Sequence, residues 1–167
     1  MDIVLQTERL FFRRFTMEDS ALLLELNSDP EVVKYVHEVP LKNLADAKAV
    51  LKDIILPQYA LNLGRWAMHL KTNLDFIGWC GLKYIEENKE IDLGYRLMKT
   101  YWGKGYASEA AKATLNYAHK KLNFAIVTGK VHVKNIASQK VLEKIGMQYE
   151  KEELEDNCPI KIYRFSI

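Results

Sequence analysis

The segment spanning residues 91–122 places the strongest constraint on how this chain can fold. It has the pattern of a β-strand that ends near Met98, a loop that contains Gly103 and Gly105, and an amphipathic helix. The expected buried side of the helix carries small and apolar residues, namely Ala107, Ala110, Ala111, Thr114, Leu115, Ala118 and Leu122. The first N–H groups of a helix lack partners within it, and glycines let the backbone approach a ligand closely. The junction therefore predicts a turn on which backbone N–H groups can bind a pyrophosphate.

Other phosphate-binding motifs fit this loop poorly. A GxGxxG motif needs a third glycine at position 108, where the chain has Ser108, and the Walker A pattern is absent from the sequence. Two glycines in a loop are also what an ordinary turn contains. On this segment alone, phosphate binding and a plain turn both remain open.

The other segments alternate between strand and helix patterns, which is typical of α/β or α+β proteins. Strands are expected over residues 10–15, 65–70, 76–84, 90–98, 125–133, 147–154 and 160–167. Helices are expected after Thr16, where Asp19 completes a capping box, over residues 29–35, over residues 44–56, and after Asn135. Pro57 should end or kink the third of these helices. No linker or repeat interrupts the pattern, so one domain over residues 1–167 is predicted.

Composition excludes several broad classes of function. The chain has 167 residues, 49% of them apolar and 28% charged, with a net charge of +2, so neither disorder nor a nucleic-acid or membrane surface is expected. The N-terminus lacks the pattern of a signal peptide, and no run approaches the roughly 20 apolar residues of a membrane span. Cys80 and Cys158 form no CxxC pair, and His37, His69, His119 and His132 have no metal-ligand spacing. A cytoplasmic protein with reduced thiols and no metal is predicted.

A second informative block follows the long helix. It comprises residues 135–138, of sequence Asn-Ile-Ala-Ser, and residues 141–146, which end in a glycine suited to a helix C-terminus. With residues 101–110 and the sequence Thr-Glu-Arg-Leu at 7–10, this block resembles the GNAT superfamily of N-acetyltransferases. The resemblance is closest to the branch of the ribosomal-protein N-terminal acetylases RimJ and RimL. It implies a single domain with a mixed, mostly antiparallel central sheet flanked by helices.

The resemblance also implies a co-substrate and the residues that hold it. Acetyl-CoA is expected, with its pyrophosphate on a loop and first helical turn made of Trp102, Gly103, Lys104, Gly105, Tyr106, Ala107 and Ser108. The backbone of Leu97 and Met98 is expected to pair with the pantetheine arm, and Asn135 and Ser138 are expected near the thioester. Trp102 stands where the family usually has Arg or Gln, which removes one possible cationic contact.

Transfer of an acetyl group to an amine needs a base, a donor that stabilises the oxyanion, and an acid for the leaving thiolate. Asp92 and Glu90 are candidate bases because they point to the same sheet face, although solvated charges on a hairpin are an open alternative. A backbone N–H near Met98 is the candidate oxyanion donor. Many GNAT members have a tyrosine as the acid where this chain has Leu142, so Ser138 is the candidate acid. An ordinary polar residue in the first turn of a helix is the alternative for Ser138.

The expected activity is acetyl transfer from acetyl-CoA to a primary amine, either a protein N-terminal α-amine or a small-molecule amine. Neutralising an α-amine of pKa roughly 8 at pH 7 costs only about 1.4 kcal/mol, whereas a lysine amine costs nearly 5 kcal/mol, so the acceptor sets how strong a base is needed. A non-catalytic acyl-CoA-binding or regulatory module is the alternative, and a general phosphate- or nucleotide-binding protein fits less well. A monomer and a weak homodimer both remain open.

Overall fold

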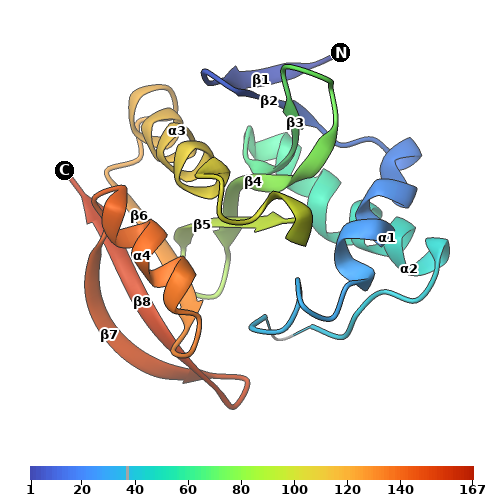
Figure 1. Ribbon diagram of the computed structural model, residues 1–167. Helices are drawn as coiled ribbons and strands as arrows, with labels where there is room; N and C mark the ends of the chain where they lie inside the picture. The colour runs from blue at the N-terminus through green and yellow to red at the C-terminus, as the bar shows by residue number, and fades with distance from the viewer. Residues whose placement is uncertain (37) are drawn as a thin grey trace.

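The computed structural model describes residues 1–36 and 38–167, which build one eight-stranded sheet (Figure 1). The sheet order is β1-β2-β3-β4-β5-β6-β8-β7. The strands are β1 (Ile3–Gln6), β2 (Leu10–Arg14), β3 (Gly64–Leu70), β4 (Phe76–Ile85), β5 (Glu90–Leu97), β6 (Ile126–His132), β7 (Gln148–Glu155) and β8 (Cys158–Ser166). All neighbours are antiparallel except β5 and β6. The mixed, mostly antiparallel sheet is confirmed, and β1 is a strand that the sequence pattern did not predict.

The β5 and β6 strands separate soon after they meet, as Figure 1 shows near the middle of the sheet. Within the described residues, their parallel register contains the single pair Asp92 and Thr128. Thr128 Oγ1 also donates to the Ile91 carbonyl at 3.2 Å, which closes this end of the gap. Beyond that point β5 continues to Leu97 without β6 beside it. The sheet therefore contains an opening whose closed end is at Asp92.

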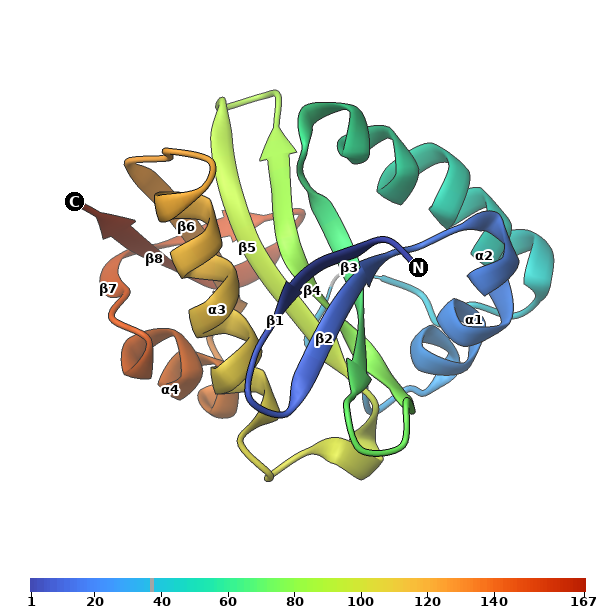
Figure 2. The ribbon, with the colours of Figure 1, turned by 90° about the horizontal axis from the view of Figure 1, so that it is seen from above.

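Helices cover the two faces of the sheet separately, as Figure 2 shows. The α3 helix (Tyr106–Lys120) packs on one face, where the predicted residues Ala110, Ala111, Thr114, Leu115 and Ala118 are buried. The α1 (Ser20–Ser28) and α2 (Leu44–Val50) helices pack on the other face in a second apolar cluster. Small side chains bring α3 close to the strands, so its N-terminus lies beside the opening.

Residues 29–36 form turns rather than the predicted short helix. The Val32 and Val33 N–H groups both donate to the Asp29 carbonyl, at 3.1 and 3.3 Å. The Asp29 carboxylate accepts from the Glu31 N–H at 2.9 Å, which offers the backbone an alternative to helical pairing. The prediction of a helix here was wrong because the turn at Asp29 does not propagate, and a separate turn follows in which the Val36 N–H donates to the Val33 carbonyl at 3.2 Å.

The predicted helix over residues 44–56 changes type along its length. After α2 it becomes a π-helical turn over Leu51–Ile55 and then a 3-10 helix over Leu56–Leu61. Pro57 lies in the first turn of that 3-10 helix, where its missing N–H costs no hydrogen bond. Pro57 therefore does not end the helical segment. The chain continues past it as a tighter, 3-10 helix.

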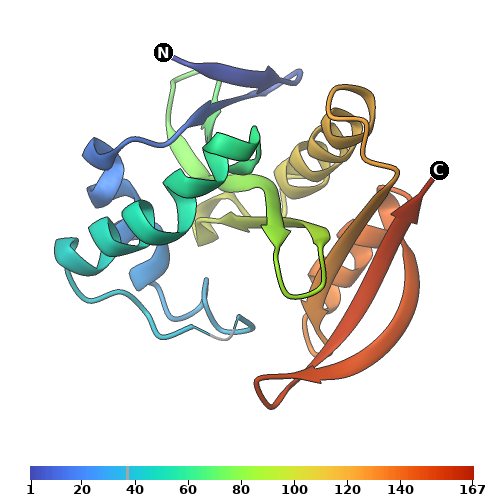
Figure 3. The ribbon, with the colours of Figure 1, turned by 180° about the vertical axis from the view of Figure 1, so that it is seen from behind.

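The C-terminal third of the chain forms the far wall of the opening. The α4 helix (Ile136–Lys144) begins at Asn135 and is followed by Gly146, whose φ of +99° is left-handed as predicted. The β7 and β8 strands then form the predicted final hairpin, which Figure 3 shows curving away from the rest of the sheet. Two walls thus face each other across the gap, β5 with α3 on one side and β6 with α4 on the other.

Candidate active site

A cavity of about 700 Å³ occupies the opening between β5 and β6, and residues from both sheet faces line it. Most of the predicted site residues are in its wall, namely Asp92, Leu97, Trp102, Gly103, Gly105, Tyr106, Ala107, Ser108, Asn135 and Ser138. Among the described residues, Met98, Lys104 and the alternative base Glu90 are predicted positions outside the wall. The segments that the sequence analysis singled out therefore converge on one cavity.

The loop that leads into α3 presents backbone N–H groups without partners. Gly103 and Gly105 have φ values of +74° and +81°, a left-handed conformation that glycine adopts without strain. Gly105 is the N-cap and has no side chain to cap the helix, so the first bond of the helix is Glu109 N–H to the Gly105 carbonyl at 3.1 Å. Within the described residues, no acceptor is bonded to the N–H groups of residues 106–108. These donors and the helix dipole make this turn, called the anion-binding turn below, suited to holding an anion at one end of the cavity.

Trp102 fixes the end of β5 through its indole. Its Nε1 donates to the Leu97 carbonyl at 2.9 Å, so the residue that replaces the usual Arg or Gln holds the loop against the strand. The Met98 N–H donates to the Ile77 carbonyl of β4 at 2.9 Å. Of the N–H groups near Met98 considered as the oxyanion donor, that of Met98 itself is therefore engaged elsewhere. Because successive N–H groups of a strand point to opposite sides, the Leu97 N–H faces the opening instead.

Arg9 and Glu109 tie the anion-binding turn to the first hairpin. Arg9 Nε pairs with Glu109 Oε2 at 2.6 Å, and Arg9 Nη1 donates to the Lys104 carbonyl at 2.9 Å. The Arg9 guanidinium also lies over the Tyr106 ring, 4.4 Å from its centroid, and Thr7 Oγ1 donates to Glu109 at 2.6 Å. Thr7, Arg9 and Glu109 thus have a physical role, which is to hold residues 104–106 in place.

We expect Arg9→Met to raise the KM for acetyl-CoA about tenfold with kcat changed little. Without Arg9, acetyl-CoA must order the loop when it binds, and this ordering reduces the free energy of binding. Steady-state rates with acetyl-CoA as the varied substrate measure this. Arg14→Met is the matched control, since Arg14 pairs with Asp2 and lies over Tyr59, away from the loop. An unchanged KM in Arg9→Met would show that the loop holds its shape without this contact.

Tyr95 and Ser138 form a hydrogen bond across the opening. Tyr95 Oη and Ser138 Oγ are 2.8 Å apart, one from β5 and the other from α4. Burial raises the pKa of Tyr95, so its phenol stays protonated in the neutral range. Asn135 Oδ1 accepts from the Ser138 N–H at 3.2 Å and caps α4, which gives Asn135 a positioning role. Sequence reasoning missed Tyr95, although strand alternation places it on the cofactor-loop face, opposite to Asp92.

Asp92 lies at the closed end of the opening with an unpaired oxygen. Its Oδ1 is buried and has no hydrogen-bond partner among the described residues. Burial raises the pKa of Asp92 to about 7, against the opposing effect of Arg65, Lys130 and Lys83. A carboxyl group that titrates near neutral pH beside a cavity is suited to proton transfer.

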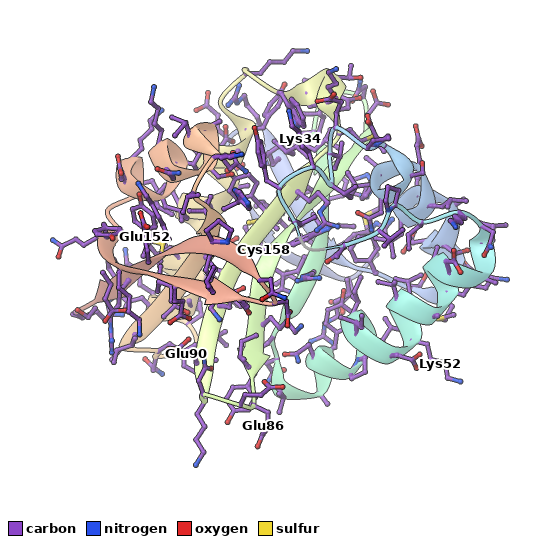
Figure 4. The ribbon with its side chains drawn as sticks, turned by 90° about the horizontal axis from the view of Figure 1, so that it is seen from below. Lys34, Lys52, Glu86, Glu90, Glu152 and Cys158 are labelled. Carbon is purple, nitrogen blue, oxygen red and sulfur yellow. The ribbon has the colours of Figure 1, made fainter. Side chains whose placement is uncertain are left out.

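The turn segment 31–36, with Glu38, forms another part of the cavity wall. Figure 4 shows Lys34 of this segment on the same side of the sheet as Cys158 at the start of β8. The segment contacts both walls of the gap, since the Tyr35 ring lies 5.6 Å from that of His132 on β6 and Glu38 pairs with Arg96 of β5 at 3.0 Å. His37 lies outside the described residues.

The remaining predictions on side chains concern thiols and metals. Cys80 is buried, shares a hydrogen bond with Thr114 at 3.2 Å, and has a pKa raised by burial to about 12, so it is a packed thiol as predicted. Among residues 1–36 and 38–167, no group of three or more His, Cys, Asp or Glu side chains could hold a metal ion. None of the described helices has the length and apolar character needed to cross a membrane.

Comparison with known proteins defines the class to which this fold and cavity belong. A family model described as the acetyltransferase (GNAT) domain matches residues 9–148, which include the anion-binding turn and both walls of the opening. The chain belongs to the GNAT acetyltransferase family. It is accordingly an acetyl-CoA-dependent N-acyltransferase, as predicted.

The relatives share nearly the whole domain. An uncharacterised N-acetyltransferase of Bacillus licheniformis, p20, is 34% identical over 87% of this chain and 83% of its own length. A crystal structure of a GNAT acetyltransferase from Bacillus anthracis is 27% identical with a TM-score of 0.81, covering 99% of this chain and 98% of that one. A structure of RimL, a ribosomal-protein α-N-acetyltransferase in complex with coenzyme A, has a TM-score of 0.84 at 18% identity, over 99% of this chain and 98% of that one. The fold of the predicted branch is confirmed.

Proposed function

We propose that this protein moves the acetyl group of acetyl-CoA directly onto a primary amine, with the two substrates entering the opening from opposite sheet faces. The pyrophosphate binds the N–H groups of residues 103–108, and the pantetheine arm runs along the free edge of β5 toward the Leu97 N–H. The amine enters from the face covered by α1, α2 and the 31–36 segment. The observation that carries this proposal is the single cavity lined from both faces, with the unpartnered Asp92 oxygen at its closed end.

Asp92 acts as the base in this scheme, directly or through one water molecule. The amine nitrogen forms a bond to the thioester carbon and loses its proton to the Asp92 carboxylate. The pKa of about 7 supports this role, because an ionised carboxylate is present near neutral pH and is basic enough to take up a proton. Glu90 is less suited, since its carboxylate accepts from the Asn88 side chain at 2.7 Å and it does not line the cavity.

Tyr95 and Ser138 supply the proton for the leaving sulfur. When the carbon–sulfur bond breaks, the electron pair stays on sulfur, and a neighbouring hydroxyl donates a proton to it. The raised pKa of Tyr95 and its 2.8 Å contact with Ser138 support a shared relay. Many relatives have a tyrosine at the position of Leu142, and in this scheme a phenol from a different element takes its place.

We expect Tyr95→Phe to lower kcat about 10- to 100-fold while the KM for acetyl-CoA changes little, because the ring packing stays and a proton donor is lost. Ser138→Ala should have a similar effect. The double variant should be hardly slower than the slower single variant, since two members of one relay do not add. Tyr117→Phe is the matched control, because Tyr117 contacts Trp66 edge-on and lies outside the cavity wall.

Thiol release from acetyl-CoA, measured against a panel of peptides and small amines, tests the proposed function as a whole. Release that requires one class of amine and falls in Ser138→Ala and Tyr95→Phe supports it. Binding of acetyl-CoA without release in the presence of any amine would favour the acyl-CoA-binding module instead. The panel also identifies the acceptor, which is either a peptide N-terminus or a small amine.

A further inference from the structure

Arg65 stands apart from the other arginines of this chain. Of the six arginines in the sequence, Arg9, Arg13, Arg14, Arg96 and Arg164 each have a carboxylate partner within 4.0 Å. Within the described residues, the Arg65 guanidinium has no such partner and donates no hydrogen bond to any side chain or carbonyl. Its several N–H donors nevertheless line the cavity, where burial lowers the pKa of Arg65. A partly buried cation without an ion-pair partner is costly unless a ligand supplies one.

The surroundings hold this guanidinium in a fixed place. Arg65 lies on β3 opposite Gly81 of β4, and its guanidinium carbon is 4.3 Å from the centroid of the Trp79 ring. Two carboxyl groups, those of Glu38 and Asp92, act on it electrostatically, but neither forms an ion pair with it. Glu38 pairs with Arg96, which is also bonded to Asn27 at 2.7 Å. Stacking orients the Arg65 guanidinium, and the Glu38 carboxylate is committed to another arginine. The site is therefore preorganised for a planar anion such as a carboxylate.

A smaller apolar pocket begins at the same place. It has a volume of about 260 Å³ and shares the wall residues Glu38, Arg65, Trp79 and Arg96 with the main cavity. The rest of its wall is largely apolar, with Leu23, Leu41, Val50, Ile54 and Ile55 from α1, α2 and their neighbours. A ligand bound to Arg65 can therefore place an aliphatic group in this pocket.

Asp92 and Arg65 share one side of the sheet. Every second residue of β5 points to the same face, so Asp92, Gly94 and Arg96 share the face that Trp79 of β4 occupies. An added Cβ at Gly94 would lie 3.4 Å from the Trp79 ring. Gly94 thus lets the Trp79 ring lie close over β5 between Asp92 and Arg96. Arg65 acts electrostatically on the Asp92 carboxyl, so an amine near Asp92 and a carboxylate on Arg65 can belong to one small molecule.

We propose that the acceptor is a carboxylate-bearing primary amine of the amino-acid class with an apolar side chain, bound by its carboxylate to Arg65 and by its side chain in the smaller pocket. This rests on the proposed function and selects the small-molecule acceptor over a peptide N-terminus, in which the first residue has no free carboxylate. The positive charge of Arg65 then makes specificity depend on the acceptor's anionic group.

Matched acceptors test this proposal in the wild-type protein. Leucine, leucinamide and 3-methylbutylamine share one side chain and differ in the group at the carboxylate position, and methionine and phenylalanine with their amides extend the series. We expect kcat/KM about 100-fold higher for the carboxylates than for the amides, because a charged hydrogen-bonding partner is lost in the amides. Equal or higher rates with the amides or amines, or with peptides, would overturn the proposal and leave acetyl transfer intact.

Variants of Arg65 tie the preference to this side chain. In Arg65→Gln the carboxylate preference should fall to within about threefold, in Arg65→Lys it should be intermediate, and in the surface control Arg164→Gln it should be unchanged. The Kd for acetyl-CoA serves as the check of folding in each variant. A preference that survives in Arg65→Gln overturns the assignment. If that variant does not fold, Arg65→Lys and the wild-type series decide. Acetyl-CoA binding without thiol release for every amine would instead reject the proposed function itself.

Discussion

Replacing Asp92 with asparagine is expected to lower kcat/KM by about 10²- to 10⁴-fold, the usual contribution of a general base. The same change is expected to raise the free energy of unfolding by about 1–2 kcal/mol, because it removes a buried, unpaired carboxylate. Activity and stability therefore move in opposite directions. Thiol-release kinetics and chemical denaturation of the same preparation measure the two effects.

The pH dependence follows from the raised pKa of Asp92, about 7 in the folded protein against a reference value of 3.8. The base form increases as pH rises, so kcat/KM should increase through pH 7 and level off above it. Because the folded state binds the proton more tightly than the unfolded chain, the carboxyl contributes stability below about pH 4. That contribution declines as the pH rises from 4 toward 7. Both dependences should be absent in Asp92→Asn.

Glu90→Gln is the matched control for Asp92→Asn, with the same loss of charge on the same strand. Glu90 lies near the β4–β5 turn, close to Glu86 in Figure 4 and outside the cavity wall. We expect its activity and pH profile to match the wild type. A loss of activity in Glu90→Gln, or full activity in Asp92→Asn, would assign the base to another group.

Replacing Ala107 with glutamate is expected to weaken acetyl-CoA binding about 100-fold, because it sets a negative charge among the N–H groups that face the pyrophosphate. Ala107 lies in the first turn of α3 and in the cavity wall. An acidic residue at this end of a helix stabilises the helix slightly, so the melting temperature should be equal or higher. Isothermal titration with coenzyme A and a thermal melt separate binding from folding.

Asn116→Glu provides the corresponding control, since it adds the same charge to an exposed position of α3 more than two turns from the loop. Its Kd for coenzyme A should stay within about twofold of the wild type, because exposed charges at that distance are screened. Similar affinities in Ala107→Glu and wild type would mean that the pyrophosphate binds elsewhere.

Local patterns in the sequence predicted most of the fold because they depend on short-range physics. The period of α3, the glycines before it and the caps of α4 at Asn135 and Gly146 each specify one element. The 29–35 segment was misread, since Pro30 suits a helix start and the competing turn at Asp29 depends on a side-chain hydrogen bond. The β1 strand was missed because the edge of a sheet is formed by long-range pairing with β2.

The site was predictable where backbone geometry defines it and less so where distant elements meet. The loop residues and Asp92 follow from the strand–loop–helix unit, whereas the Tyr95–Ser138 contact joins β5 to α4 and depends on how far the two strands separate. The engagement of Met98 with Ile77 follows from the register of β4 and β5, which no local pattern encodes. Arg65 likewise stands out only in the folded structure, where each of the other arginines has a carboxylate partner and Arg65 has none among the described residues.

The most direct test of this account is the initial-rate pattern of thiol release when acetyl-CoA and the acceptor amine are both varied. A cavity that holds both substrates at once predicts lines that intersect in double-reciprocal plots, and no acetylated protein when acetyl-CoA is present alone. Parallel lines, together with an acetyl group retained on the protein, would contradict direct transfer across the β5–β6 opening.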